Sequence, residues 1–104
     1  MSVIRRTSAR RDIVEIADYL DRINQALSDQ FLEAVEQTCS RLEGMLRMGA
    51  PFPLVNPSLQ NLRHHPIQGF SNYIAFYLTT TDGIEVVHVL HGARDIVNIL
   101  EAEP

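Results

Sequence analysis

The chain has 104 residues and a mass of 11.8 kDa, so we expect one domain spanning residues 1–104. An apolar fraction of 45% and a charged fraction of 21% are typical of a globular core and exclude a disordered tail. The net charge is −4, all nine basic residues are arginine and lysine is absent, which argues against the strongly basic surface of a general nucleic-acid binder.

No apolar run approaches the roughly 18 residues that a membrane helix needs. The basic residues near the start are not followed by the apolar stretch of a secretion signal. We therefore expect a cytoplasmic protein that does not bind a membrane.

The first half of the chain predicts a strand followed by a helical hairpin. Residues 2–6 are typical of a short strand, and Thr7 or Ser8 offers a hydroxyl to cap the first helix. Asn24 provides a break and a second cap, and Gly49 followed by Pro51 is expected to end the second helix. The residues that recur at helical spacing are Ile13, Ile16, Ala17 and Leu20 in the first helix, and Phe31, Val35, Thr38, Cys39, Leu42, Met45 and Leu46 in the second.

The second half predicts a connector and an antiparallel meander. Residues 51–57 contain three prolines and are expected to be a connector. Strands are predicted over residues 62–66, 73–80 and 84–90, the last two joined by a turn at Thr81-Asp82-Gly83, and residues 96–100 form a short helix or strand. The fold class is α+β: an N-terminal strand and a helical hairpin packed on a small antiparallel sheet in the order β-α-α-β-β-β, with a short C-terminal segment.

The strand predicted at residues 73–80 is apolar on both faces, although a helical hairpin can cover only one face of a small sheet. The second face is therefore either a partner site or a surface that the C-terminal segment or a loop covers. The residues predicted on the two faces are Ile74, Phe76 and Leu78 on one, and Tyr73, Ala75 and Tyr77 on the other.

Four of the nine arginines, Arg5, Arg6, Arg10 and Arg11, fall within seven residues. This cluster is either a solvated face or a site for an anion or an acidic partner, since the guanidinium fork can pair with two oxygens at once.

Metal and cofactor chemistry find little support in the residue pattern. His64 and His65 are adjacent and His88 and His91 are three apart, so the rings of each pair face opposite sides of a regular strand. Cys39, the single cysteine, lies on the apolar stripe of the second helix and is expected in the core. No catalytic motif is present, so we expect no metal, no cofactor and no catalytic residue, and a domain that binds partners.

The segment Val86-Val87-His88-Val89-Leu90-His91-Gly92-Ala93-Arg94-Asp95, with Gly69–Tyr77 upstream, resembles the ParE toxins of the RelE/ParE superfamily. Residues 9–20 resemble the first helix of the family, residues 31–35 with Leu42 its second helix, and Leu62-Arg63 the strand that opens its meander. The similarity covers nearly all of the chain in the right order.

The resemblance implies the toxin of a bacterial type II toxin–antitoxin pair, neutralised by a ParD-type antitoxin in a hetero-oligomeric complex. It implies that the toxin poisons DNA gyrase by binding it, without specific DNA binding of its own. On this basis the candidate target contacts are Arg63, His91, Arg94 and Asp95, and the candidate antitoxin contacts are Arg5, Arg6, Arg10, Arg11, Tyr73 and Tyr77.

Two alternatives stay open. A RelE-like messenger RNA endonuclease would use lysines and arginines to hold phosphates, but lysine is absent and Ile74 stands where the nuclease pattern has arginine, leaving Arg94 and Arg63. An inactive relative that only binds an antitoxin is the other alternative.

Overall fold

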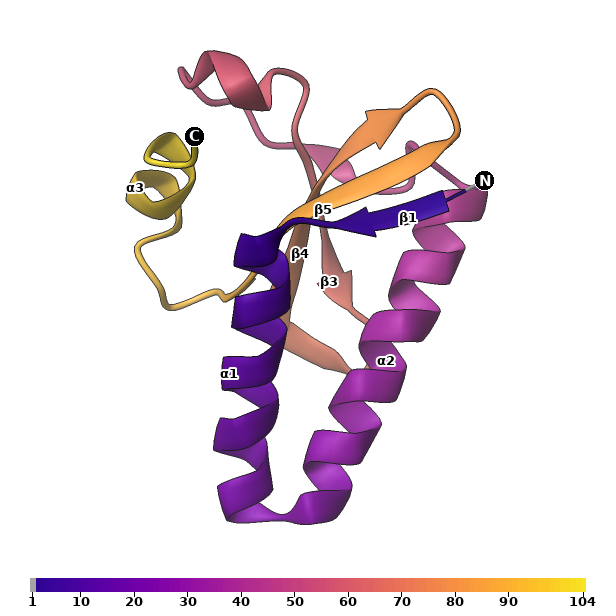
Figure 1. The fold of residues 1–104 in the computed structure, drawn as a ribbon, viewed down its shortest axis with the longest axis vertical. Helices are drawn as coiled ribbons and strands as arrows, with labels where there is room; N and C mark the ends of the chain where they lie inside the picture. Colours follow the sequence, from indigo (N-terminus) through magenta and orange to yellow (C-terminus); the bar gives the residue numbers. More distant parts are fainter. Residues whose placement is uncertain (1) are drawn as a thin grey trace.

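The computed structural model describes residues 2–104, and in it an antiparallel helical hairpin packs on a five-stranded sheet (Figure 1). This confirms the predicted α+β fold. The helices are α1 (Thr7–Ile23), α2 (Gln25–Gly44), the 3-10 helix η1 (Pro57–Leu59) and α3 (Ile96–Glu101). The strands are β1 (Ser2–Arg5), β2 (Ala50–Pro51), β3 (Arg63–Ile67), β4 (Phe70–Thr80) and β5 (Gly83–His91).

The sheet has the order β1-β5-β4-β3-β2, and β3, β4 and β5 form the predicted antiparallel meander. The N-terminal strand β1 pairs with β5 in parallel, so the sheet is mostly rather than wholly antiparallel. A parallel pair requires a long crossover, and the helical hairpin between β1 and the meander supplies it.

One residue interrupts the pairing of β4 with β5. Tyr77 lies opposite Val86, whereas Phe76 lies opposite His88, so Val87 is an extra residue in β5. Because residues that face each other across two strands share a side of the sheet, His88 lies on the side of Phe76 and not on that of Tyr77.

The predicted cap of the first helix is wrong. Arg6 precedes α1 and no side chain caps its first turn, because the Ser8 hydroxyl donates instead to the carbonyl oxygen of Val87 at 2.7 Å. The predicted cap of the second helix is confirmed, since the Asn24 side chain accepts a hydrogen bond from the N–H of Ala26.

The predicted end of the second helix is also wrong. Helix α2 ends at Gly44 rather than at Gly49, and Ala50–Pro51, expected to enter a connector, form the short edge strand β2. Gly49 lies against Tyr77 instead, and its N–H donates to the Tyr77 hydroxyl.

The boundaries of the other strands shift by one to three residues. Strand β3 continues through Pro66 to Ile67, which is possible because β2 pairs only with Arg63 and His64 and leaves the rest of that edge open. Strand β4 begins at Phe70, and β4 and β5 are joined by a turn at Thr81 and Asp82 with Gly83 already in β5. The C-terminal segment is the helix α3.

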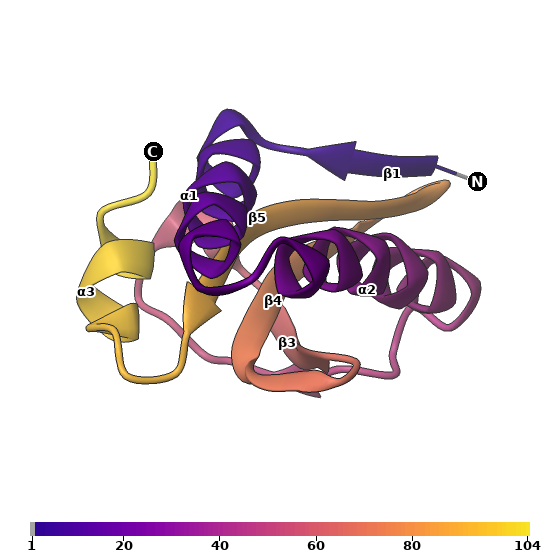
Figure 2. The same ribbon diagram turned by 90° about the horizontal axis from the view of Figure 1, so that it is seen from below.

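The helical hairpin buries one side of the sheet in a first apolar cluster (Figure 2). Phe31 is its central aromatic side chain and meets Phe70 and Tyr73 edge to face at 5.5 and 5.4 Å between ring centres. The fully or nearly buried members are Ala9, Leu20, Phe31, Ala34, Val35, Cys39, Leu42, Ile67, Ala75, Tyr77, Ile84, Val86 and Val89.

The opposite side of the sheet is covered by the chain itself. The connector between α2 and β3, with α3, packs there in a second cluster formed by Leu59, Leu62, Phe76, Val87, Leu90 and Leu100. The assignment of the β4 side chains to the two faces is therefore confirmed, and the interpretation of the second face as a partner site is wrong. None of the helices within residues 2–104 is long and apolar enough to cross a membrane.

Candidate functional site

A pocket of about 200 Å³ lies between α1 and the end of β5. It brings together three candidates from the sequence, Tyr73, His91 and Arg94. Tyr73 and His91 are opposite each other on β4 and β5, and their rings meet edge to face at 5.1 Å. The other lining residues are Asp12, Glu15, Ile16, Tyr19, Val89 and Leu90. We call this set the His91–Arg94 pocket.

The turn that follows β5 is ordered by two hydrogen bonds to His91. The His91 Nδ1 atom accepts a hydrogen bond from the N–H of Ala93 at 3.0 Å, and the N–H of Arg94 donates to the His91 carbonyl oxygen. The Arg94 side chain is exposed and forms no ion pair within residues 2–104. Asp95 has a structural role: it precedes α3, and its carboxylate accepts a hydrogen bond from the side-chain amide of Asn98 at 2.7 Å.

The Tyr73 phenol of the pocket stays protonated at neutral pH. Burial, and then the neighbouring Tyr19 hydroxyl, raise the pKa of Tyr73 above its ordinary value. The pocket therefore offers a hydroxyl donor, an imidazole and a free guanidinium around an opening that also carries the carboxylates of Asp12 and Glu15. This arrangement suits contact with polar and aromatic side chains of a partner.

Arg63 does not join Arg94. Its guanidinium donates to the Gly49 carbonyl oxygen at 2.6 Å and lines a separate pocket with Arg47, Asn61 and Thr79. The structure thus separates two candidates that the sequence grouped as target contacts.

Tyr77 is fully buried in the first cluster, so its side chain is not part of the surface that a partner would meet. Tyr73 is half-buried at the edge of the His91–Arg94 pocket and remains accessible. Cys39 lies in the core, as predicted, and burial raises the pKa of its thiol against the opposing charge of Arg5.

The four clustered arginines line one groove of about 710 Å³ at the start of α1. Two of them are ion-paired: Arg5 with Glu36 at 2.6 Å, and Arg6 with Glu85 at 2.9 Å. Arg10 and Arg11 are exposed and form no ion pair within the described part of the chain. We call this surface, which also includes Thr7, Ser8, Glu103 and Pro104, the arginine groove.

An apolar depression of about 400 Å³ continues from the arginine groove along the helical hairpin and shares Arg5 and Arg10 with it. Val14 of α1 and Leu32 of α2, which are 58% and 41% exposed, line it. The sequence analysis missed this surface. Its signal was present, because both residues are apolar and lie outside the helical stripes that form the core.

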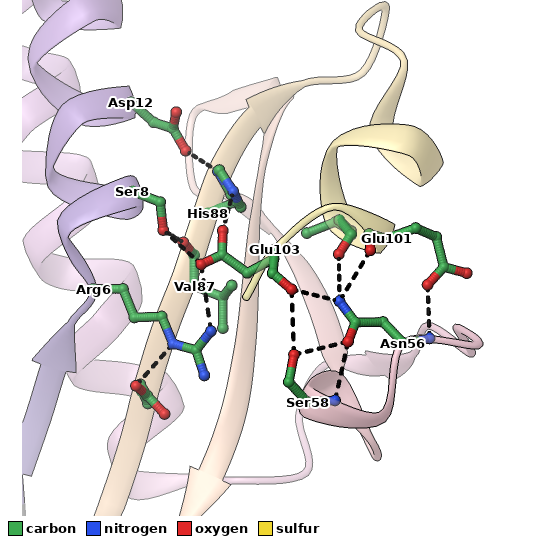
Figure 3. A network of polar contacts seen from close by, with 11 residues as sticks. Arg6, Ser8, Asp12, Asn56, Ser58, Val87, His88, Glu101 and Glu103 are labelled. Carbon is green, nitrogen blue, oxygen red and sulfur yellow. Dashed lines mark hydrogen bonds and ion pairs between the residues drawn. The ribbon is translucent and has the colours of Figure 1, made fainter.

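The sequence analysis also missed a polar network at the free edge of β5. Strand β1 pairs with β5 only as far as Val86, and beyond it the backbone of β5 is satisfied by side chains of α1: Ser8 donates to Val87, and Asp12 accepts from the N–H of Val89 at 3.0 Å. His88 joins the network through both ring nitrogens (Figure 3).

The histidine pairs do not converge, in agreement with the strand register: His88 lies opposite Phe76 and His91 opposite Tyr73. Across residues 2–104, no group of three or more histidine, cysteine, aspartate or glutamate side chains is arranged to hold a metal ion.

One comparison with known proteins identifies the family of the chain. No curated protein matches the chain. The family described as the ParE toxin of type II toxin-antitoxin system, parDE, matches residues 3–96, which include both helices of the hairpin, the whole meander and the His91–Arg94 pocket. The chain therefore belongs to the ParE toxin family of type II toxin–antitoxin systems.

Proposed function

We propose that this member of the family inhibits DNA gyrase by binding it in the cytoplasm, and that a ParD-type antitoxin neutralises it. The observation that carries the proposal is the family match over residues 3–96, because it covers nearly the whole fold and the pocket at its end. Membership implies an antitoxin partner, and the ParE branch is the one whose members are generally taken to act on gyrase.

The distribution of basic side chains favours binding over RNA cleavage. A nuclease needs several cationic or donor groups converging on one scissile phosphate. Arg63 is bonded to the Gly49 carbonyl and lines a different pocket from Arg94, while Ile74 packs in the second apolar cluster. These positions leave Arg94 as the one arginine in the His91–Arg94 pocket.

The His91–Arg94 pocket is the surface that we assign to the target. Arg94 is exposed and has no ion pair within residues 2–104, so its guanidinium is available to a carboxylate or phosphate of a partner. Tyr73 and His91 flank it and add aromatic contact area, which commonly dominates the energy of protein interfaces.

The arginine groove and the apolar depression beside it form the surface that we assign to the antitoxin. Arg10 contributes to both, so cationic and apolar side chains lie next to each other along the outside of the helical hairpin. The matching partner is an acidic segment with apolar side chains on one face, such as an amphipathic helix lying along the depression. Its carboxylates would meet Arg10 and Arg11, and its apolar residues Val14 and Leu32.

A gyrase assay with the purified chain tests the target. We expect lost supercoiling and accumulation of cleaved plasmid, both reversed by the cognate antitoxin. Arg94→Ala should weaken inhibition at least about tenfold, since losing a hydrogen bond to a charged group typically costs about 1.5–3 kcal/mol. Arg22→Ala removes another exposed arginine, one outside these pockets, and should inhibit like the unmodified chain. Unchanged supercoiling with folded protein would contradict the gyrase proposal.

Titration with the product of an adjacent antitoxin gene tests the second surface. Arg10→Ala should lower the affinity and flatten its dependence on salt, because both reflect the same exposed charge, whereas Arg22→Ala should change neither. Equal effects of the two substitutions would place the antitoxin elsewhere.

The same protein distinguishes the alternatives. Messenger cleavage in a translation extract, abolished by Arg94→Ala, would favour the endonuclease. Tight antitoxin binding without growth arrest and without an effect on gyrase would identify an inactive relative.

A further inference from the structure

The last residues of the chain fold back onto the arginine groove. The carboxylate of Glu103 lies between three side chains: its Oε1 atom is 2.8 Å from His88 Nε2, and its Oε2 atom is 3.5 Å from both Arg6 Nη1 and Ser8 Oγ (Figure 3). Glu103 and Pro104 are thereby part of the lining of the groove, together with Arg10 and Arg11.

The contact with His88 depends on the charge of the ring. Its Nδ1 atom is 2.6 Å from Asp12 Oδ2, and its Nε2 atom is 2.8 Å from Glu103 Oε1. A neutral imidazole carries one N–H and can donate to only one of the two carboxylates, whereas the imidazolium donates to both. The observed geometry, with a carboxylate on each ring nitrogen, is therefore that of a protonated histidine.

The charged groups around His88 come from three parts of the chain. Asp12 lies on α1 and Glu103 follows α3, while Arg6, between β1 and α1, pairs with both Glu103 and Glu85 of β5. Burial lowers the pKa of His88, but the hydrogen bond and charge of Asp12, together with those of Glu103, outweigh it, so the pKa lies above its ordinary value. The ring therefore keeps its proton to a higher pH than an ordinary histidine does.

Loss of the proton would affect the two carboxylates unequally. Asp12 is anchored on α1 and also accepts the N–H of Val89 at 3.0 Å, so the remaining proton on Nδ1 satisfies it. Glu103 would then face the lone pair of Nε2, an acceptor opposite an acceptor, with only its two 3.5 Å contacts left. The backbone of the segment stays attached, because the Asn56 amide donates to the Glu103 carbonyl at 2.8 Å and does not titrate.

We propose that the Glu103 side chain is a proton-controlled latch on the arginine groove. Protonated His88 holds the carboxylate in the groove beside Arg6 and Ser8, and deprotonation releases it, so that a carboxylate of an acidic partner can take its place there. The latch itself follows from these contacts alone; its gating of a partner rests on the proposed function of the groove.

Nuclear magnetic resonance of the full chain tests the latch. Between pH 6 and pH 9 the backbone and side-chain signals of Glu103 should titrate together with the His88 ring, and the Glu103 side chain should become more mobile at the alkaline end. Glu103→Gln keeps the shape and removes the charge, so the His88 titration midpoint should move down. Glu85→Gln is the matched control, because Glu85 also pairs with Arg6 but does not touch His88. In this variant the titration midpoint of His88 should stay closer to that of the unmodified chain.

The latch is overturned if Glu103 is equally ordered at both ends of the pH range, or if Glu103→Gln and Glu85→Gln move the midpoint equally. His88→Gln provides a second route, because a glutamine cannot titrate and Glu103 should then behave the same at every pH. A pH-dependent change of Glu103 that survives in this variant would likewise reject the latch.

Binding of hexaglutamate at constant ionic strength tests the gating. We expect its affinity to rise about threefold or more when the latch opens at alkaline pH or is removed in Glu103→Ala at pH 6, as for removal of a competing state. An affinity for hexaglutamate that depends neither on the pH nor on the substitution at Glu103 would refute the gating. No binding in any state, with the Glu103 side chain shown to be released, would refute the proposed function of the groove and leave the latch intact.

Discussion

The hydroxyl of Tyr77 and the backbone N–H of Gly49 are hydrogen-bonded to each other inside the fold. The N–H of Gly49 donates to Tyr77 Oη at 2.9 Å, and the hydroxyl in turn donates to the carbonyl oxygen of Leu46 at 3.1 Å. Arg63 completes the arrangement by donating to the Gly49 carbonyl at 2.6 Å. Tyr77 and Arg63 thus hold the segment that leads from α2 to β2. From the sequence, Tyr77 was a candidate antitoxin contact and Arg63 a candidate target contact.

Tyr77→Phe should destabilise the protein by about 1–3 kcal/mol, because it leaves the buried N–H of Gly49 without an acceptor. Urea unfolding followed by circular dichroism measures the change. Tyr73→Phe removes a hydroxyl that has no hydrogen-bond partner within residues 2–104, and its cost should be within about 0.5 kcal/mol. Similar losses for the two variants would disprove the structural role of the Tyr77 hydroxyl.

Gly49→Ala should be destabilising by about 1–3 kcal/mol, the usual cost of overpacking. A Cβ atom at this position would lie 2.5 Å from the Tyr77 hydroxyl oxygen and 2.8 Å from the backbone oxygen of His64. Gly44→Ala is the matched control: nothing lies within 4 Å of a Cβ there, and alanine in the last residue of α2 should stabilise by up to about 1 kcal/mol. The two substitutions should therefore move the unfolding midpoint in opposite directions, and a shift of the same sign would contradict the packing.

Asn56→Ala should loosen α3. The Asn56 amide donates to the carbonyl oxygens of Leu100 and Glu103 at 3.0 and 2.8 Å, and the Glu101 carboxylate accepts from the N–H groups of Val55 and Asn56 in return. We expect a loss of about 1–3 kcal/mol and faster amide hydrogen exchange in α3. Asn72→Ala, whose side chain forms no hydrogen bond within the described residues, should leave exchange in α3 unchanged. Protection that persists in Asn56→Ala would show that apolar packing alone holds the helix.

The free energy of unfolding contributed by His88 should fall as the pH rises above the ordinary histidine value of about 6.5. Because the pKa of His88 is raised on folding, its contribution is fully present below the ordinary histidine value of about 6.5 and is lost as the pH rises through the folded value. Denaturation at a series of pH values in the unmodified chain and in His88→Gln isolates this contribution. His65 acts in the opposite sense, since burial, followed by Arg41 and His64, lowers its pKa, and it destabilises the fold only below 6.5. A slope above neutrality that is the same in His88→Gln would assign it to other groups.

Local patterns of residues explain which expectations succeeded. The spacing of apolar residues in the hairpin, the cap at Asn24 and the alternation in β4 each act over a few residues, and all three are confirmed with one exception. The prediction that placed Met45 on the apolar stripe of the second helix is wrong, because α2 ends at Gly44 and Met45 is 60% exposed. The failed expectations involve competition between local and distant partners. Ser8 has the chemistry of a cap, but its hydroxyl bonds to Val87, 79 residues away, because that edge of β5 has no neighbouring strand.

For the candidate site the division is similar. His91 and Arg94 lie within one turn, so the sequence could predict that they act together, and the fold adds Tyr73 through strand register. In the sequence, Arg63 looked equivalent to Arg94, yet its guanidinium donates a hydrogen bond to the Gly49 carbonyl oxygen. Nothing in the local sequence distinguishes these two arginines.

By itself the sequence determined the order of the elements, the two apolar faces of β4, the burial of Cys39 and the resemblance to a toxin family, because each is encoded in spacing along the chain. Only the tertiary structure decided what covers the second face of the sheet, which arginines remain free, and that Asp12, His88 and Glu103 form one network. Asp12 and Glu103 reach His88 from 76 and 15 residues away. Their charges interact only weakly until folding brings them within hydrogen-bond distance and removes most of the water between them.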